Sequence, residues 1–381
     1  MAKKKLLFFS IFIIIILVFV TIYNIIYKNN NIYLNNKDAA PNFISIMLEE
    51  TAGSGEYKVS KSNKWPSKGY VFNKEMSYCN NGSTLAWNKN DNSVSVNINK
   101  TDKCYVYFDI YVPTLAEYVK SQYTGTQGNN NIYHHDGTLE NGIDDGSYRY
   151  AGPSDTTNNY VCFGSDANPC PDANLFRIIG VFGDQTKVIR AKFNGNQYWD
   201  TNVSNTWSTS DLNTYLNGKY LASLGTLADK IATTTWKVGG GIYSNVATSV
   251  PKTAYKNELG VNSSTTTYDA KIGLMYVSDY YYAASPSAWT LVGDNSDSTK
   301  DYRAAKNLNW LCLDSAEWTI SRNSDNSERV FYAGGVGQVG DYYASAYVPW
   351  RPSFSLLTSI TYVSGSGTQS DPIRINWLTT V

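Results

Sequence analysis

The sequence predicts a single N-terminal transmembrane helix, followed by a small all-β module and then a larger α+β domain. Three observations support this prediction. An uncharged apolar run lies near the start of the chain, short alternating segments between turn residues follow it, and helical patterns occur beyond residue 113. The chain has 381 residues, which is enough for about two domains and an anchor.

Residues 6–27 form the apolar run and contain no charged side chain. As a helix they would be about 33 Å long, which spans the hydrocarbon core of a lipid bilayer. Three lysines precede the run, so residues 1–5 are expected to be a cytosolic tail. The bulky residues 25–27 close the run where a cleavable signal peptide has small ones, which favours an uncleaved signal anchor over a cleaved signal peptide.

This interpretation places the protein in the cell membrane as a single-pass protein, with the lipid bilayer as the partner of residues 6–27. Residues 28–42 are polar and rich in asparagine, which is typical of a linker. Everything after the anchor is predicted to be extracellular. In either interpretation of the N-terminus the rest of the chain is exported, and exported proteins form disulfides.

Five cysteines occur in the sequence. Cys79 with Cys104, and Cys162 with Cys170, are the natural local pairs, and each disulfide would stabilise the fold by roughly 3 kcal/mol. Cys312 is then left over. A buried free thiol is the favoured interpretation of this residue.

Residues 43–113 predict short strands separated by turns. The segment 93–98 alternates polar and apolar residues, which is the pattern of a half-buried strand. We therefore expect a small module that resembles an immunoglobulin domain or another β-sandwich. In a module of this size the Cys79–Cys104 bridge would matter most for stability.

The domain at 114–381 begins with a predicted amphipathic helix at 114–123, capped by Thr114. Further along, residues 174–182 and 186–193 are apolar and surround a glycine. This pattern predicts a β-hairpin with a three-residue loop at 183–185.

The clearest helical pattern is at 208–224, with Ser208 or Thr209 as the expected cap. Gly218 interrupts it, so we expect a bent or broken helix. Residues 271–277 are a candidate buried strand, and Ser278 would cap a helical turn after it. Short strands are also expected late in the chain, at 310–313, 329–333, 346–356 and 372–375.

The segment 317–356 is the best candidate for a functional region. Its ends are dense in tryptophan and arginine, and its middle is rich in glycine, tyrosine and serine. Tyrosine and tryptophan provide large contact areas at low entropic cost, and serine and glycine add adaptable hydrogen bonds. We therefore expect residues 334–347 to face a partner. The candidate ligand-binding residues are Tyr342, Tyr343, Tyr347, Gln338 and Asp341.

Two alternatives remain open for this segment. The tyrosines would belong to the core instead if strand alternation turned them inward. The ends carry Trp318, Arg322, Trp350 and Arg351. These arginines would either clamp a ligand or brace loop carbonyls as part of the structural frame, and the frame is favoured.

Four segments carry a resemblance to bacterial members of the C-type-lectin fold, in the branch shared with the formylglycine-generating enzyme. They are YLNGKYL, KIGLMYVSDY, EWTISR and WRPSFSL, at 215–221, 271–280, 317–322 and 350–356. The resemblance implies a C-type-lectin-like α+β fold for residues 114–381. The cysteine pair of that enzyme and the Glu-Pro-Asn, Gln-Pro-Asp and Trp-Asn-Asp motifs of calcium-dependent lectins do not occur. The resemblance therefore implies the fold without the chemistry.

A second resemblance covers nearly the whole exported chain. The blocks DKCYVYFD and GSGTQSDPIRI, among others, resemble membrane-anchored surface proteins of Gram-positive-type gut bacteria. This resemblance implies a surface location and brings no activity with it.

Charge and composition argue against several functional classes. Lysine plus arginine equals aspartate plus glutamate, at 32 each, so no overall field favours nucleic acid. His134, His135 and Asp136 lack the spacing of a metal site, and the acidic loops at 141–145 and 294–297 lack EF-hand spacing. With two histidines in total, nucleophilic catalysis has little material. We expect no metal, no cofactor and no enzymatic activity.

The sequence thus favours a cell-surface binding or adhesion protein that recognises a glycan or a protein through aromatic loops. The first alternative is a structural subunit of the cell envelope or of an appendage, in which the aromatic surface packs on copies of itself. A weaker alternative is an enzyme of unknown reaction. The late loops could also form a diversified binding surface.

Overall fold

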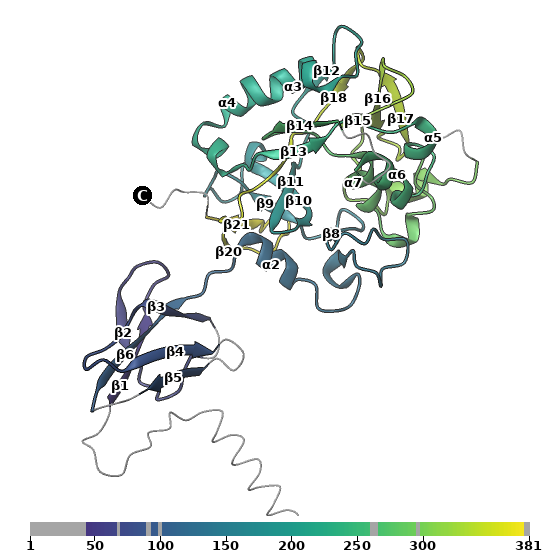
Figure 1. Cartoon of the computed structure of the whole chain (residues 1–381). Coiled ribbons are helices and arrows are strands. Elements are labelled where there is room, and N and C mark those ends of the chain that lie inside the picture. The colour runs from purple at the N-terminus through teal and green to yellow at the C-terminus, as the bar shows by residue number, and fades with distance from the viewer. Residues whose placement is uncertain are drawn as a thin grey trace, which may run out of the picture. The chain divides into compact units, whose positions relative to one another are not determined.

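A computed structural model describes residues 43–66, 69–88, 93–97, 101–259, 266–294 and 298–376. They form two compact units that divide between Val112 and Pro113 (Figure 1). We call residues 43–112 the small unit and 113–376 the large unit. As the sequence predicts, the regular structure is mostly β-strand, with few and short helices.

The predicted tail, transmembrane helix and linker at 1–5, 6–27 and 28–42 lie outside the described residues. Within the residues that are described, no helix is both long enough and apolar enough to cross a membrane.

The small unit contains a four-stranded sheet with the order β2-β1-β6-β3. Its central pair, β1 and β6, is parallel, and the outer pairs are antiparallel. The strands are β1 (Phe43–Glu49), β2 (Tyr57–Val59), β3 (Tyr70–Cys79) and β6 (Lys103–Ile110). Strands β4 (Thr84–Asn88) and β5 (Ser93–Asn97) form a separate antiparallel pair.

The core of the small unit is limited. Ile46, Val106 and Phe108 are its buried apolar residues. The β4–β5 pair packs on the sheet through Trp87, whose ring lies 5.7 Å from that of Phe72 and 5.8 Å from that of Phe108. The alternating segment predicted at 93–98 is strand β5 over its described residues. With so few buried groups, this unit needs a covalent brace.

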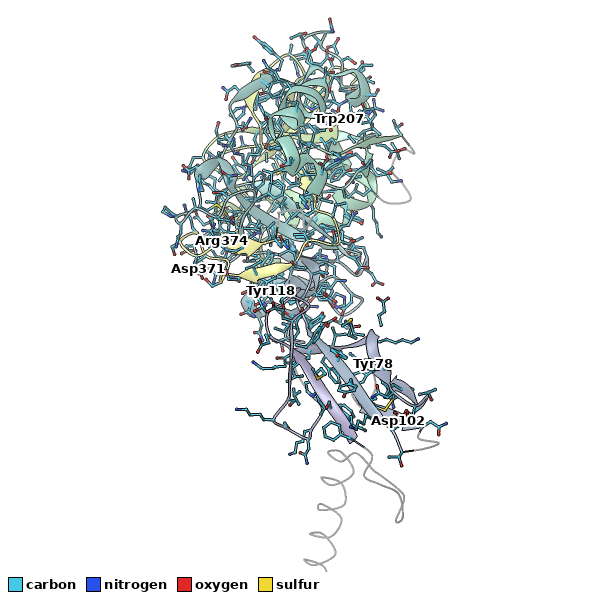
Figure 2. All side chains as sticks on the ribbon, turned by 90° about the vertical axis from the view of Figure 1, so that its left-hand side faces the viewer. Tyr78, Asp102, Tyr118, Trp207, Asp371 and Arg374 are labelled. Carbon is cyan, nitrogen blue, oxygen red and sulfur yellow. A yellow bond between two sulfur atoms is a disulfide. The ribbon has the colours of Figure 1, made fainter. Side chains whose placement is uncertain are left out.

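That brace is the predicted disulfide between Cys79 and Cys104, which are opposite each other in the β3–β6 ladder. Beside it, Asp102 accepts hydrogen bonds from the backbone N–H groups of Asn81, Ser83 and Lys103 at 2.7–3.0 Å. Figure 2 labels Asp102 and Tyr78 in this unit. The carboxylate therefore fixes the turn that leads from β3 towards β4.

The large unit is built on an eight-stranded sheet whose main order is β19-β11-β10-β9-β21-β20. Strand β8 joins it through β10, and β7 pairs with β8. Most pairs are antiparallel, and β21 runs parallel to β9. The strands are β7 (Ile132–His134), β8 (Tyr148–Tyr150), β9 (Tyr160–Cys162), β10 (Leu175–Phe182), β11 (Gln185–Arg190), β19 (Ser353–Ser355), β20 (Tyr362–Ser364) and β21 (Ile373–Ile375).

The described residues of the large unit also form three smaller sheets. The first pairs β12 (Asn196–Tyr198) with β18 (Tyr347–Pro349). The second pairs β13 (Thr234–Lys237) with β14 (Thr267–Ala270). The third is a three-stranded sheet of β15 (Glu317–Arg322), β16 (Arg329–Ala333) and β17 (Val339–Tyr343).

The helices of the large unit are short and lie around these sheets (Figure 1). The α-helices are α2 (Leu115–Ser121), α3 (Asp211–Tyr215), α4 (Leu221–Ser223), α5 (Tyr243–Val246), α6 (Pro251–Glu258), α7 (Val277–Tyr282) and α8 (Tyr302–Lys306). A π-helical turn spans Leu216–Tyr220. Turns of 3-10 helix span Asn129–Asn131, Asp172–Asn174, Trp207–Thr209, Gly225–Lys230 and Pro286–Ala288.

Local signals near helix starts were partly correct. Helix α2 is confirmed with its cap, because Thr114 and Glu117 form a reciprocal capping box. The helix expected at 208–224 is interrupted at Gly218 by the π-helical turn. Its predicted cap is wrong, since the hydroxyl of Ser210 accepts the capping hydrogen bond from the N–H of Asn213.

Some strand predictions were also wrong in detail. The β10–β11 hairpin has a two-residue loop, because Gln185 already pairs with Phe182. Residues 271–276 are not a strand but a buried extended segment with one bridge, Gly273 to Ser353. Tyr276 rather than Ser278 is the N-cap of the following helix. Residues 310–313 form a turn.

Most of the aromatic content of the large unit is core. Seven tryptophans are almost completely buried: Trp199, Trp207, Trp236, Trp289, Trp310, Trp318 and Trp350. The second predicted disulfide, Cys162–Cys170, is present. Cys312 is a partly buried free thiol. The high tryptophan count therefore reports on packing, and exposed tyrosines are the better guide to a surface site.

Removing the Cys79–Cys104 bridge should destabilise the small unit alone. We expect the double variant Cys79→Ser/Cys104→Ser to lose about 3 kcal/mol of unfolding free energy there, because the unfolded chain is no longer constrained. Hydrogen exchange read by mass spectrometry should show faster exchange in 43–112 and unchanged exchange in 113–376. Equal loss of protection in both units would contradict this assignment.

Candidate functional site

The predicted partner-facing segment, 334–347, forms a β-turn region, strand β17 and a second tight turn. The N–H of Gly334 donates to the carbonyl of Gln338 at 2.6 Å, which closes the first turn. Gly337 sits in it with φ +102°, and a Cβ there would lie 2.1 Å from the carbonyl oxygen of Tyr302. Only glycine fits such a position. The turn thus starts β17 in a fixed register against β16.

Tyr342 stands on this strand with its ring stacked on Tyr332, at 3.9 Å between centroids. It also contacts the edge of Trp318, with centroids 6.4 Å apart. Gly340 lies opposite Tyr332 in the ladder, and a Cβ at Gly340 would come within 2.9 Å of the Tyr332 hydroxyl. Glycine leaves room for the stack. Tyr342 is thereby held in place while remaining 39% exposed.

Tyr343 is the next residue and points to the other face of the strand, as alternation requires. The guanidinium of Arg329 lies 4.4 Å from its ring centroid. Arg329 also forms an ion pair with Asp341 at 2.9 Å. Tyr343 is 49% exposed, but it belongs to a different face from Tyr342.

The chain then turns sharply, with the N–H of Ala346 donating to the carbonyl of Tyr343 at 2.8 Å. Strand β18 follows and pairs with β12, so that Tyr347 lies directly opposite Tyr198. The two rings are 5.0 Å apart. Tyr347 is 59% exposed and Tyr198 is 41% exposed. The ladder therefore presents a pair of touching tyrosines.

Trp318 connects the two ladders. Trp318 lies on β15, and its indole N–H donates to the carbonyl of Gln197 in β12 at 3.0 Å. Its ring contacts that of Tyr342 on β17. The buried ring thus fixes Tyr342 relative to the β12–β18 pair. We call the exposed rings of Tyr198, Tyr342 and Tyr347 the tyrosine surface.

The structure brings together only part of the predicted site. Gln338 is partly buried, and its amide folds over the turn at Gly334. Asp341 accepts hydrogen bonds from Arg329 and from Asn323, both at 2.8–2.9 Å. Asp341 is thus held by hydrogen bonds within the chain, whereas Gln338 is held mainly by its position over the turn.

Sequence reasoning missed Tyr198. It lies beside Trp199, which is completely buried. The alternation of a strand requires one of two neighbouring aromatics to point outward. That signal shows that one ring is exposed, but it does not reveal that β12 pairs with β18.

The four predicted frame residues make their polar contacts within the chain. Arg351 is buried and donates from Nε to Glu317 at 2.7 Å, and from Nη2 to the carbonyl of Leu311 at 2.8 Å. Arg322 donates to the carbonyl of Gly239 at 2.9 Å and to Asn205 at 3.2 Å. The other two, Trp318 and Trp350, are buried.

Burial raises the pKa of Glu317, and the guanidinium of Arg351 opposes this rise. Both members of the pair are almost without solvent contact. A buried ion pair of this kind is costly to break on one side only.

Several of the residues considered for metal binding pair with other side chains of the chain. His134 pairs with Asp136 at 2.9 Å and stacks on Tyr148, whereas His135 is buried against Tyr282. In the acidic loops, Asp145 pairs with Arg149 and Asp294 accepts from Tyr243. Asn295 and Asp297 lie outside the described residues.

One group in the small unit places three possible ligand atoms within 4.8 Å of one another: Cys79, Asp102 and Cys104. Its two sulfurs are bonded to each other, and a disulfide sulfur is not the thiolate that metals bind. Because Asp102 is also occupied by backbone N–H groups, this group is structural.

Comparison with protein-family models, with curated proteins and with solved structures finds no match for this chain.

The Glu317–Arg351 pair should support the fold that carries the tyrosine surface. We expect Glu317→Gln to lower the unfolding free energy of the large unit by about 3 kcal/mol, because Arg351 stays buried without a counter-charge. Asp314→Asn is the matched control. Its carboxylate pairs with Lys306 but is 96% exposed, so the change should stay within about 0.5 kcal/mol. Urea unfolding followed by tryptophan fluorescence measures both, and equal effects would contradict the assignment.

Proposed function

We propose that the large unit is a binding domain that recognises an extracellular glycan or protein through the tyrosine surface. The observation that carries this proposal is the arrangement of Tyr198, Tyr342 and Tyr347. Their exposed rings lie on two hydrogen-bonded ladders that meet at the buried ring of Trp318. Rings held in this way lose little freedom when a ligand binds.

The side chains of the tyrosine surface favour binding through apolar packing and hydrogen bonds over binding through charge attraction. Tyrosine offers a flat apolar face and one hydroxyl, which suits both sugar rings and protein side chains. Arg329 and Asp341, the charged pair beside Tyr343, neutralise each other at 2.9 Å. Electrostatic steering towards a highly charged ligand is therefore not expected here.

The wider proposal places this domain outside the cell. Residues 6–27 would anchor the chain in the membrane, and residues 114–381 would have a C-type-lectin-like fold. Two disulfides, Cys79–Cys104 and Cys162–Cys170, support an oxidising location such as the cell exterior. The site would then be presented to the surroundings of the cell by a rigid, cross-linked scaffold.

Single-residue variants test the tyrosine surface. Purified full-length protein is screened on glycan and extracellular-protein arrays, and the affinity for the best ligand is then measured by biolayer interferometry. Tyr347→Ala and Tyr198→Ala should each weaken binding by about tenfold or more, because each removes an aromatic contact worth about 1.4 kcal/mol or more. Tyr343→Ala is the comparison variant. Its ring lies on the opposite face of β17 from Tyr342, and we expect this change to leave the affinity unchanged.

Two outcomes would contradict the proposal. If Tyr347→Ala binds the ligand with the same affinity as the unaltered protein, the ligand does not bind at this surface. Failure of every array ligand, together with concentration-dependent assembly in light scattering, would favour a structural subunit that packs on copies of itself.

A further inference from the structure

The large unit buries a lysine in direct contact with a carboxylate, and neither residue belongs to the tyrosine surface. Lys187 lies on β11 and Asp279 on α7, 92 residues further along, and their Nζ and Oδ2 atoms are 2.5 Å apart. The side chains are only 9% and 2% exposed. Two charged groups are thus held together where water is excluded, which is unfavourable for the charged forms.

Aromatic rings surround the amine of Lys187. Its Nζ lies 4.7 Å from the ring centroid of Tyr276, 5.3 Å from that of Trp236 and 5.8 Å from that of Phe182. Burial lowers the pKa of Lys187, and the charge of Asp279 opposes this effect. A lowered pKa increases the fraction of neutral amine, which is the nucleophilic form of lysine.

The carboxyl group of Asp279 is held in one orientation. Its Oδ2 accepts a hydrogen bond from the backbone N–H of Tyr276 at 2.9 Å, as part of the cap of α7. Its Oδ1 faces Nη1 of Arg149 at 3.7 Å. Arg149 is itself buried and pairs with Asp145 at 2.8 Å. A donor on one oxygen and a cation near the other would stabilise negative charge that develops on this carboxyl group.

A second buried carboxyl group lies at the start of the same helix. Glu258, at the end of α6, accepts hydrogen bonds from the backbone N–H groups of Val277 and Ser278 at 3.0 and 2.9 Å, and from the hydroxyl of Ser321. Burial raises the pKa of Glu258 to about 7, against the hydrogen bonds from Ser321 and Ser278. It is close enough for its charge to act on Lys187. Such a carboxyl group can hold and release a proton near neutral pH.

We propose that Lys187 and Asp279 condense to an isopeptide bond, which cross-links β11 to α7 covalently. The ammonium of Lys187 first gives a proton to the carboxylate of Asp279 along their contact. The neutral amine then attacks Cγ of Asp279, and an N–C bond forms. One C–O bond of the carboxyl group breaks, and that oxygen leaves as water with two of the three protons that the ammonium carried. The ion pair contains every atom of the products, so no co-reactant is needed.

Three features of the site favour this condensation over a lasting ion pair. The contact holds the reacting groups together, which replaces an unfavourable encounter between two dilute groups. The product is a neutral amide, so the desolvation penalty of two buried charges disappears. Lys187, Asp279 and Tyr276 are all buried, so bulk water has little access to the amide for hydrolysis.

Intact-mass measurement of the full-length protein tests the bond directly. After reduction of the disulfides, the unaltered protein should be lighter than its sequence by the mass of one water molecule. A tryptic digest should contain a branched peptide that joins the segment around Lys187 to the segment around Asp279. Fragmentation of this peptide distinguishes the cross-link from a cyclised aspartate, which loses water without joining two segments.

Two variants sharpen the result. Lys187→Arg keeps the positive charge but has no primary amine, so it should show its full sequence mass. Asp279→Asn keeps an electrophilic carbonyl and should lose one ammonia instead of one water. A full sequence mass for the unaltered protein would overturn the proposal and leave an ion pair only. Loss of water that persists in Lys187→Arg would also overturn it, whether or not the variants fold as stably.

Discussion

The buried guanidinium of Arg351 is the interaction on which the arrangement of the large unit depends. It joins three parts of the chain: Glu317 at the start of β15, the carbonyl of Leu311, and the carbonyl of Arg190 at the end of β11. A planar cation with several fixed donors can satisfy such a set of acceptors, whereas a lysine cannot. The three-stranded sheet that carries Tyr342 is thereby fixed to the edge of the main sheet, where β11 and β19 lie.

Tryptophans of the large unit are buried, whereas its tyrosines occur both in the core and at the surface. Buried tryptophans donate their indole N–H groups to carbonyls, as Trp199 does to Thr319, Trp236 to Ala270 and Trp310 to Tyr150. Each such bond joins segments that are far apart in sequence. Each of these three tryptophans therefore fills the core with its ring and connects two segments through one hydrogen bond. Some tyrosines are buried in the same way, as Tyr280 and Tyr281 are, but the exposed large aromatic residues of this unit are tyrosines, whose hydroxyl tolerates water.

Local features of this fold could be predicted from sequence, and non-local ones could not. The capping box at Thr114 and Glu117 is complete within four residues, and the partners of the two disulfides are only 25 and 8 residues apart. By contrast, the apolar run at 271–276 is buried as expected but bonds to side chains and single bridges instead of a ladder. An apolar run of this length does not reveal where its backbone hydrogen bonds go.

The same difference between local and non-local features limits what the sequence predicts about the site. Exposed Tyr342, Tyr343 and Tyr347 follow from a segment rich in glycine and serine, but their faces depend on pairing between distant strands. The β12–β18 ladder adds Tyr198 from a segment some 150 residues earlier. Alternation along β17 turns Tyr343 to the opposite face from Tyr342. Contacts such as Lys187 with Asp279 are equally invisible in a single sequence, because nothing local links the two residues.

The tyrosine surface depends directly on one of the frame residues, Trp318. Trp318 belongs to the frame by burial, yet its N–H fixes β12 and its ring edge supports Tyr342. Any movement of β15 would therefore move Tyr342 and Tyr198 together. A surface whose elements share one buried support keeps its shape without a ligand, so binding requires little reorganisation. This is the property expected of a recognition surface, and it follows here from one indole ring between two short ladders.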